Sequence, residues 1–453
     1  MSSSALRSRQ HWLPLTGPGE HFDLLHGGHR ANVAVCTKTG RSAWRERVYP
    51  HDDARAVAIN LADADDLNVY QSQAGYRAER RIVAHVSAIP AAFVDLDYYN
   101  VPELVSLDAE SVLDRVLVAH PWLPLPTLLL NSGRGAYFQW LFNRPLSPDL
   151  LGEWQAMQEV LVGVLEPFGS DKNAKDAARV LRVVGSINLM SGERVSGLRD
   201  IGPAVQFEKF CNVVLDHGLR ELRKRAQESL GGATPLPREL RRAVDDSGRG
   251  TAAQRAQAIK PYDLAHARML DCRTIAELRG LPMTDYRHRL LFVYGVSAAW
   301  FVQSEDRLVA ELEGFAADNF ADADRYGPRC AGTVIDRMRA DRDGVIKVWV
   351  AAGKRVPNRY RLRNETILRY LDLTALEQRE LRTIMGPEER QRRRVGRRRA
   401  AGMVDRGAQA KDRAARAWEL RRAGWSQAAI AAELGVQQPA VSKMLRRAGE
   451  KYS

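Results

Sequence analysis

Two aspartates end an otherwise apolar and aromatic segment of the chain, AAFVDLDYY at residues 91–99. Asp95 and Asp97 are two positions apart, and residues i and i+2 of a strand project from the same face, so both carboxylates would point to one place. Neighbouring carboxylates repel each other unless a cation lies between them, and Mg²⁺ and Mn²⁺ prefer oxygen ligands. The pair predicts a divalent-metal site at the end of a strand, with two exposed aspartates at a sheet edge as the alternative.

The segment NSGRGAYFQW, residues 131–140, could bind an anion. Its glycines follow an apolar strand and allow backbone N–H groups to approach a ligand closely, while Ser132 and Arg134 supply side-chain donors. Ser-Gly-Arg-Gly would equally well form a plain β-hairpin turn. This motif therefore indicates either a phosphate-contacting loop or a hairpin.

A third group of polar residues lies in GSDKNAKDAARVLRVVGSIN, residues 169–188. Asp171 precedes a predicted strand that carries Arg179 and Arg182. The carboxylate could supply a further metal ligand, and the arginines could hold a triphosphate or the backbone of a template. An amphipathic segment with surface arginines is the alternative interpretation.

The order and spacing of the three groups resemble those of the archaeo-eukaryotic primase superfamily, in particular the primase-polymerases of plasmids and integrative elements. The resemblance covers roughly residues 31–205. It implies that Asp95, Asp97 and Asp171 are catalytic and bind the metals, with Asp176 as a less favoured substitute for Asp171. It also implies that the nucleotide-binding residues are Ser132, Gly133, Arg134, Tyr137, Arg179 and Arg182.

The resemblance implies a DNA replication protein of a mobile element that synthesises primers by two-metal nucleotidyl transfer. Its substrates would be nucleoside triphosphates, its template single-stranded DNA, and its cofactor Mg²⁺ or Mn²⁺. Tyr137 stands where the family usually has a histidine, and a phenol is neutral at pH 7 and cannot act as an imidazolium. The alternative hypothesis is therefore a catalytically weak or inactive DNA-binding replication initiator built on a primase fold. A rolling-circle nicking initiator that uses Tyr98 or Tyr99 is disfavoured, because its His-hydrophobic-His motif is missing from the sequence.

The sequence AWELRRAGWSQAAIAAELGVQQPAVSKMLRRAG, residues 417–449, predicts two helices joined by a tight turn at Gly435. It resembles the helix-turn-helix of resolvases and sigma factors, in which the second helix enters the major groove of duplex DNA. The residues predicted to read bases are Gln437, Gln438, Ser442 and Lys443, and those predicted to contact phosphate are Arg446 and Arg447. An ordinary helical hairpin is the alternative.

The distribution of charge supports a nucleic-acid-binding end. The chain has a formal net charge of +13, and residues 386–453 contain 17 Lys and Arg against seven Asp and Glu. The other 385 residues contain 51 basic and 48 acidic side chains. Such a basic end is typical of proteins that neutralise phosphates, although a basic tail can also serve solubility alone.

The remaining sequence features exclude several classes of protein. There is no apolar run of membrane-spanning length and no secretory signal, and the four cysteines are too scattered for a zinc site or a disulfide framework. These features predict a cytoplasmic protein that does not bind membranes. The sequence contains no GxxxxGK[ST] loop, so a separate replicative helicase would have to unwind the DNA.

The pattern of apolar residues predicts an α+β fold. Strands are predicted at 33–36, 91–98, 126–131, 136–142 and 178–185, a helix at 147–168, a buried helix at 290–302 and a further strand at 344–350. The catalytic sheet is RRM-like by resemblance, and a mainly helical domain and the helix-turn-helix follow it. The predicted domains are an N-terminal extension (1–30), a primase-polymerase-like catalytic domain (31–205), a helix and linker (206–260), a mainly helical domain (261–385), an Arg-rich linker (386–410) and a helix-turn-helix DNA-binding domain (411–453).

Overall fold

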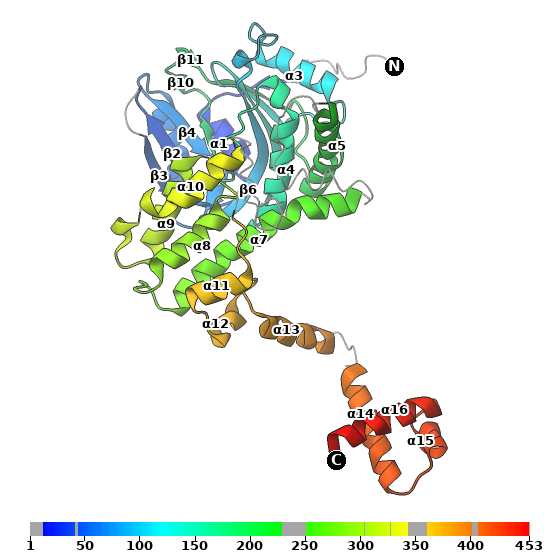
Figure 1. Ribbon diagram of the computed structural model, residues 1–453. Coiled ribbons are helices and arrows are strands. Elements are labelled where there is room, and N and C mark those ends of the chain that lie inside the picture. The colour runs from blue at the N-terminus through cyan, green and yellow to red at the C-terminus, as the bar shows by residue number, and fades with distance from the viewer. Residues whose placement is uncertain are drawn as a thin grey trace. The chain divides into compact units, whose positions relative to one another are not determined.

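In the computed structural model, two antiparallel sheets form the centre of the first structural unit, Met1–Ile384 (Figure 1). The model describes residues 12–40, 44–228, 251–302, 304–326, 328–342, 360–400 and 406–452. The larger sheet has the order β1 (Leu13–Pro14), β12 (Ser196–Arg199), β7 (Leu128–Asn131), β8 (Ala136–Leu146), β6 (Val86–Leu96) and β5 (Gly75–Tyr76). The smaller sheet has the order β3 (Arg45–Tyr49), β2 (Val33–Lys38), β4 (Asn68–Ser72) and β9 (Val180–Arg182). A short hairpin joins β10 (Ile187–Asn188) to β11 (Glu193–Arg194).

Helices cover both sheets because the strands are apolar on their inner faces. The larger sheet is in contact with α3 (Ala109–Ala119), α4 (Leu151–Val164) and α5 (Phe207–Glu228). Trp154 of α4 is fully buried and donates its indole N–H to the Ala91 carbonyl of β6, at 3.0 Å. The smaller sheet is covered by α2 (His51–Ala62), whose alanines pack against β2 and β4. The predicted α+β class is therefore confirmed.

The beginning of the described chain packs into the same unit. Strand β1 pairs with β12, and α1 (Pro18–His26) buries Phe22 and Leu25 completely or almost so. The sequence predicts an N-terminal extension over residues 1–30. The structure instead packs β1 and α1, which lie within this range, against the rest of the unit.

A helical region follows the sheets in the same structural unit, Met1–Ile384. It comprises α7 (Thr251–Leu278), α8 (Arg287–Ala298), α9 (Glu305–Asn319), α10 (Pro328–Arg342), α11 (Asn364–Leu371) and α12 (Ala375–Glu380). Helix α8 is the buried helix predicted at 290–302, although it ends at Ala298. The strand predicted at 344–350 and most of the linker within 206–260 lie outside the described residues.

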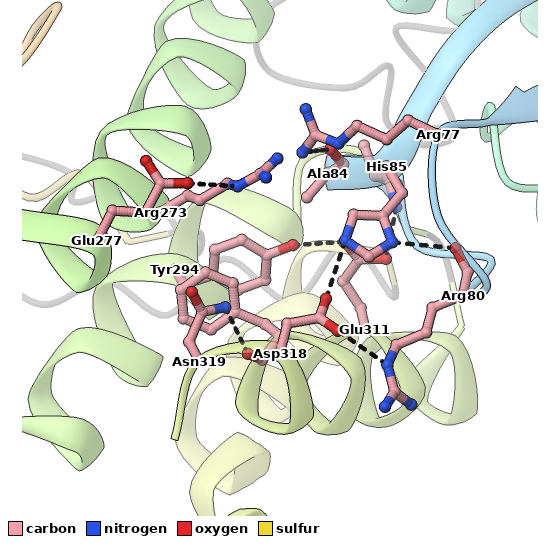
Figure 2. Close-up of polar contacts among 12 residues, drawn as sticks. Arg77, Arg80, Ala84, His85, Arg273, Glu277, Tyr294, Glu311, Asp318 and Asn319 are labelled. Atoms are coloured by element: carbon pink, nitrogen blue, oxygen red, sulfur yellow. Dashed lines mark hydrogen bonds and ion pairs between the residues drawn. The ribbon is translucent and has the colours of Figure 1, made fainter. Parts of the chain in front are cut away.

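The helical region is held against the loop that precedes β6 by polar contacts (Figure 2). Asp318 of α9 accepts hydrogen bonds from Arg80 and His85 of this loop, both at 2.9 Å. Glu311, also on α9 and fully buried, accepts the Tyr294 hydroxyl at 2.6 Å and the Val83 N–H at 2.8 Å. Buried polar groups need such partners to avoid a desolvation cost, so the contacts specify where α9 packs.

The second unit, Met385–Ser453, contains α13 (Pro387–Ala400), α14 (Arg406–Arg422), α15 (Gln427–Glu433) and α16 (Gln438–Tyr452). Helix α13 occupies much of the predicted Arg-rich linker. A small core of Ala417, Leu420, Ile430, Val441 and Leu445 holds α14, α15 and α16 together. Ser426 caps α15 by accepting the Ala429 N–H at 3.2 Å, and Gly435 makes the turn before α16 with φ +62°. No helix in the described part of the chain is both long and apolar enough to span a membrane.

Candidate functional site

The acidic residues of the candidate site lie at the end of β6. Asp95 is the second-last residue of this strand, and Asp97 follows the strand directly. In the sheet register Asp95 is opposite Tyr137 of β8. Both aspartates are partly exposed, in contrast to the buried residues that precede them in the strand.

Asp171 is brought to the same place by backbone pairing. The Asp171 N–H donates to the Asp95 carbonyl at 2.8 Å, and the Asp97 N–H donates to the Gly169 carbonyl at 2.8 Å. Gly169 has φ +82°, and a side chain there would put Cβ only 2.9 Å from the Asp97 carbonyl oxygen. Residues 169–171 thus run along the end of β6, which requires glycine at the first position.

The three carboxylates share one electrostatic environment. Removal from water raises the pKa of Asp95 well above its usual value, and the charges of Asp97 and Asp171 raise it further. The pKa of Asp97 is also raised, first by burial and then by Asp171. This mutual repulsion is what a divalent cation would offset.

The carboxylates do not form a complete metal cage. Within the described residues, no group of three or more His, Cys, Asp or Glu side chains is arranged to hold a metal ion. Oxygen donors of this kind nevertheless fit Mg²⁺, which is usually bound by one or two carboxylates together with water and substrate phosphates. The donor set of Asp95, Asp97 and Asp171 therefore fits a metal that arrives with a nucleotide.

The SGRG segment forms a tight turn beside the aspartates. The Ser132 N–H donates to the Gly135 carbonyl at 2.9 Å, and the Gly135 N–H donates to the Ser132 hydroxyl at 3.2 Å. Gly133 has φ +91°, and its N–H donates to the Asn131 side chain at 2.8 Å. The Ser132 hydroxyl and the N–H groups of Ser132, Gly133 and Gly135 already form hydrogen bonds within the turn. We therefore expect a ligand to be bound here by the Arg134 side chain.

Arg134 is exposed and lies close to Asp97. Its guanidinium carbon is 4.2 Å from the centre of the Tyr99 ring, and its charge offsets part of the rise that burial causes in the pKa of Asp97. Gly135 allows this approach, since a Cβ there would lie 2.3 Å from the Leu96 carbonyl oxygen.

Arg182 faces the acidic residues from the smaller sheet. Its guanidinium donates to the Asn68 side chain at 2.5 Å and lies 4.8 Å from the centre of the Tyr70 ring. Tyr137 is buried and forms a hydrogen bond with the backbone of Arg182. Burial and the charge of Asp95 both raise the pKa of Tyr137, so its phenol stays neutral. Sequence reasoning missed Asn68 and Tyr70, because β4 is remote from every motif in the chain.

Arg179 also faces the acidic residues. Its charge, like that of Arg182, offsets part of the rise that burial causes in the pKa of Asp95. Arg179 also pairs with Asp176, at 3.5 Å, and Asp176 is almost completely buried. This pairing with Arg179 favours Asp171 over Asp176 as the third acidic residue of the site.

The residues predicted to contact DNA lie at the start of α16 and just before it. Gln437, Gln438, Ser442, Lys443 and Arg446 are all exposed, while Val441 and Leu445 of the same helix are buried. Arg447 lies on α16, with its side chain outside the described part of the structure. One face of α16 is therefore available to a partner.

Comparison with known proteins finds a similar replication protein. A replication protein of Clostridium perfringens is 25% identical over 378 residues, which are 81% of this chain and 78% of the relative. The chain resembles a replication protein. This resemblance was predicted from the motifs and is confirmed. No protein-family model matches the chain.

Three solved structures are similar in fold, each with a TM-score of 0.31. The AEP domain of the cyanophage S-2L primase-polymerase is 17% identical, and the match covers 43% of this chain and 94% of that domain. The primase RepB' is 12% identical, with 73% of this chain and 99% of that structure covered. The catalytic domain of RepB' in complex with initiator DNA is 11% identical, with 47% and 98% covered.

Proposed function

We propose that this chain is a replication protein that synthesises primers on a single-stranded DNA template by nucleotidyl transfer. The observation that carries the proposal is the convergence of three carboxylates, from two segments far apart in sequence, opposite Arg179 and Arg182. The relative is a replication protein by name, which supports the same role.

In this proposal Asp95, Asp97 and Asp171 hold one or two Mg²⁺ or Mn²⁺ ions. When bound, the metal would lower the pKa of the attacking 3′-hydroxyl and stabilise charge on the transferred phosphoryl group. Arg134, Arg179 and Arg182 would hold the triphosphate, because guanidinium groups match phosphate oxygens in geometry and charge. Ser132 and Gly133 would shape the turn that places Arg134.

The alternative is a DNA-binding initiator that keeps the fold without the chemistry. The observation in its favour is Tyr137, whose buried, neutral phenol is bonded to the Arg182 backbone and cannot supply a positive charge. The proposal of an enzyme therefore requires that Arg179 and Arg182 supply the positive charge on that side of the site.

The second unit is proposed to bind duplex DNA as a helix-turn-helix. Helix α16 would lie in the major groove, with Gln437, Gln438, Ser442 and Lys443 at base edges and Arg446 and Arg447 at phosphates. The exposure of the described members of this set and the Gly435 turn before α16 support the proposal. A separate helicase would supply strand separation.

Primer synthesis on a circular single-stranded DNA tests the catalytic proposal. The assay uses labelled ribo- or deoxynucleoside triphosphates with Mg²⁺ or Mn²⁺. We expect metal-dependent products from the wild type and at least a 100-fold loss in Asp95→Asn and in Asp97→Asn, since each removes a charged oxygen ligand. Asp66→Asn, which changes an exposed aspartate outside the site, should be as active as the wild type. Equal inactivity of all four proteins would contradict the enzyme and leave the initiator.

A further inference from the structure

Helix α13 carries arginines at intervals of three and four residues, which form a row along one side. Arg390, Arg394, Arg397 and Arg398 are spaced at i, i+4, i+7 and i+8, which places them on one face of a helix. All four are exposed. At 1.5 Å per residue, this arginine face extends for about 12 Å along the helix.

The arginine face brings like charges close together, and Arg390 of this face donates to the Gly386 carbonyl at 3.4 Å. Like charges at i and i+4 destabilise a helix slightly. The acidic partner on this helix, Glu389, is bonded to Arg392 at 2.6 Å and to Arg393 at 2.7 Å, away from the centre of the arginine face. Four positive charges exposed on one face of a helix are explained most simply by an anionic partner.

We propose that the arginine face of α13 binds the phosphate backbone of duplex DNA without reading its sequence. Duplex DNA presents one negative charge per about 1.7 Å of its axis, so a face of this length meets several phosphates. Guanidinium groups bind phosphate oxygens in a bidentate manner. This contact is additional to the base-reading contacts proposed for α16 and does not depend on the catalytic proposal.

The composition of α13 distinguishes this partner from two others. The helix, PEERQRRRVGRRRA, has no aromatic side chain on which the bases of a single strand could stack. It also lacks the apolar face, with residues such as Trp, Phe and Leu, that inserts amphipathic helices into membranes. The phosphate backbone of duplex DNA can be bound by the arginine charges of α13 alone, without aromatic or apolar side chains.

The experiment measures the salt dependence of binding to a 30-base-pair duplex of random sequence, using the full chain. In the variant Arg390→Gln/Arg394→Gln/Arg397→Gln/Arg398→Gln we expect the slope of log K against log salt to become shallower by about 3 to 4, because about 0.9 counterions are released per phosphate contact. Glutamine is a good helix former, and circular dichroism will check that the helix remains. Replacing the same four arginines with lysine keeps the charges, so the slope of log K against log salt should stay close to the wild-type value.

The control removes the same net charge elsewhere, in Arg45→Gln/Arg115→Gln/Arg220→Gln/Arg369→Gln, four exposed arginines of the first unit. Its slope should stay close to the wild-type value. An equal loss of slope in both variants would overturn the proposal, as would an unchanged slope in the α13 variant. A loss of binding confined to single-stranded DNA or to anionic vesicles would also overturn it.

Primer synthesis at low salt should be unaffected in both variants. Failure of this proposal and failure of the catalytic proposal are therefore distinguishable.

Discussion

At the level of single residues, the site depends on side chains that hold Arg182 in place. Asn68 accepts a hydrogen bond from the guanidinium, the Tyr70 ring lies beneath it, and Tyr137 is bonded to its backbone. We infer that Asn68 and Tyr70 position Arg182 without contacting the nucleotide. Tyr137, which the resemblance predicts to bind the nucleotide, also holds the Arg182 backbone.

Replacing Asn68 tests this role. We expect Asn68→Ala to raise the KM for the nucleotide about tenfold with a smaller change in kcat, because a hydrogen bond to a charged group contributes about 1.5–3 kcal/mol. Asn68→Asp keeps the oxygen that accepts from Arg182 but loses the N–H that donates to the Lys38 carbonyl at 3.2 Å, so it should restore part of the wild-type KM. Asn212→Ala is the matched control, since Asn212 bonds Arg255 in the same way far from the site in sequence, at 2.8 Å. A KM for Asn68→Ala equal to that of the control would contradict the positioning role.

The aspartates could be predicted from the sequence because their spacing has a direct structural meaning. Asp95 and Asp97 are two apart at the end of an apolar strand, and the structure places them there. The roles of Asn68 and Tyr70 could not be predicted, because they follow from the pairing of β4 with β9, a contact between segments about 110 residues apart.

At the level of elements, the pattern of apolar residues was insufficient to predict that α1 is a packed helix. Its sequence, PGEHFDLLH, is rich in polar residues, yet His21 and His26 are completely buried. The His26 ring bonds the Ser72 carbonyl of β4 at 3.0 Å and His29 at 3.1 Å, and His21 bonds Gln71 at 3.3 Å. One nitrogen of each ring, His21 Nδ1 and His26 Nε2, bonds a partner in the distant strand β4. The sequence alone therefore suggests an extension where the structure has a packed helix.

These histidines predict a loss of stability in acid. Burial lowers the pKa of His21 and of His29 to about 4, whereas an unfolded histidine has an ordinary value near 6.5. The unfolded chain therefore binds more protons between these values, and the free energy of unfolding falls as pH decreases from about 6.5 to about 4. We expect the Tm to fall over this window, and less steeply in His21→Leu, which cannot bind a proton. An identical pH profile in that variant would show that His21 is not responsible.

At the level of the whole molecule, the chain divides into a unit with the candidate catalytic site and a basic unit without it. Of the formal charge of +13, residues 386–453 contribute 17 basic against seven acidic side chains. This separation predicts that sequence-specific duplex binding and nucleotidyl transfer can be lost independently.

The variant Gln438→Ala/Lys443→Ala tests the independence of the two units. Both side chains are exposed on α16. We expect their loss to reduce discrimination between a selected duplex and a random one at least tenfold, because contacts to bases determine which DNA sequence is bound and contacts to phosphates do not. Lys209→Ala, which removes an exposed charge from the first unit, should leave discrimination unchanged. Primer synthesis should persist in both proteins, and its loss in the α16 variant would show that the units act as one.

We propose that Asp171, brought to Asp95 by backbone pairing, completes one metal-dependent nucleotidyl-transfer site. Extension of an annealed primer by a single labelled nucleotide in Mn²⁺ tests it most directly, because this step needs neither initiation nor strand separation. We predict a primer longer by one nucleotide and release of pyrophosphate by the wild type, with at least a 100-fold slower rate in Asp171→Asn and an unchanged rate in Asp66→Asn. Equal rates in the wild type and Asp171→Asn, or no extension by a wild type that binds the primer and the metal-nucleotide complex, would contradict the claim.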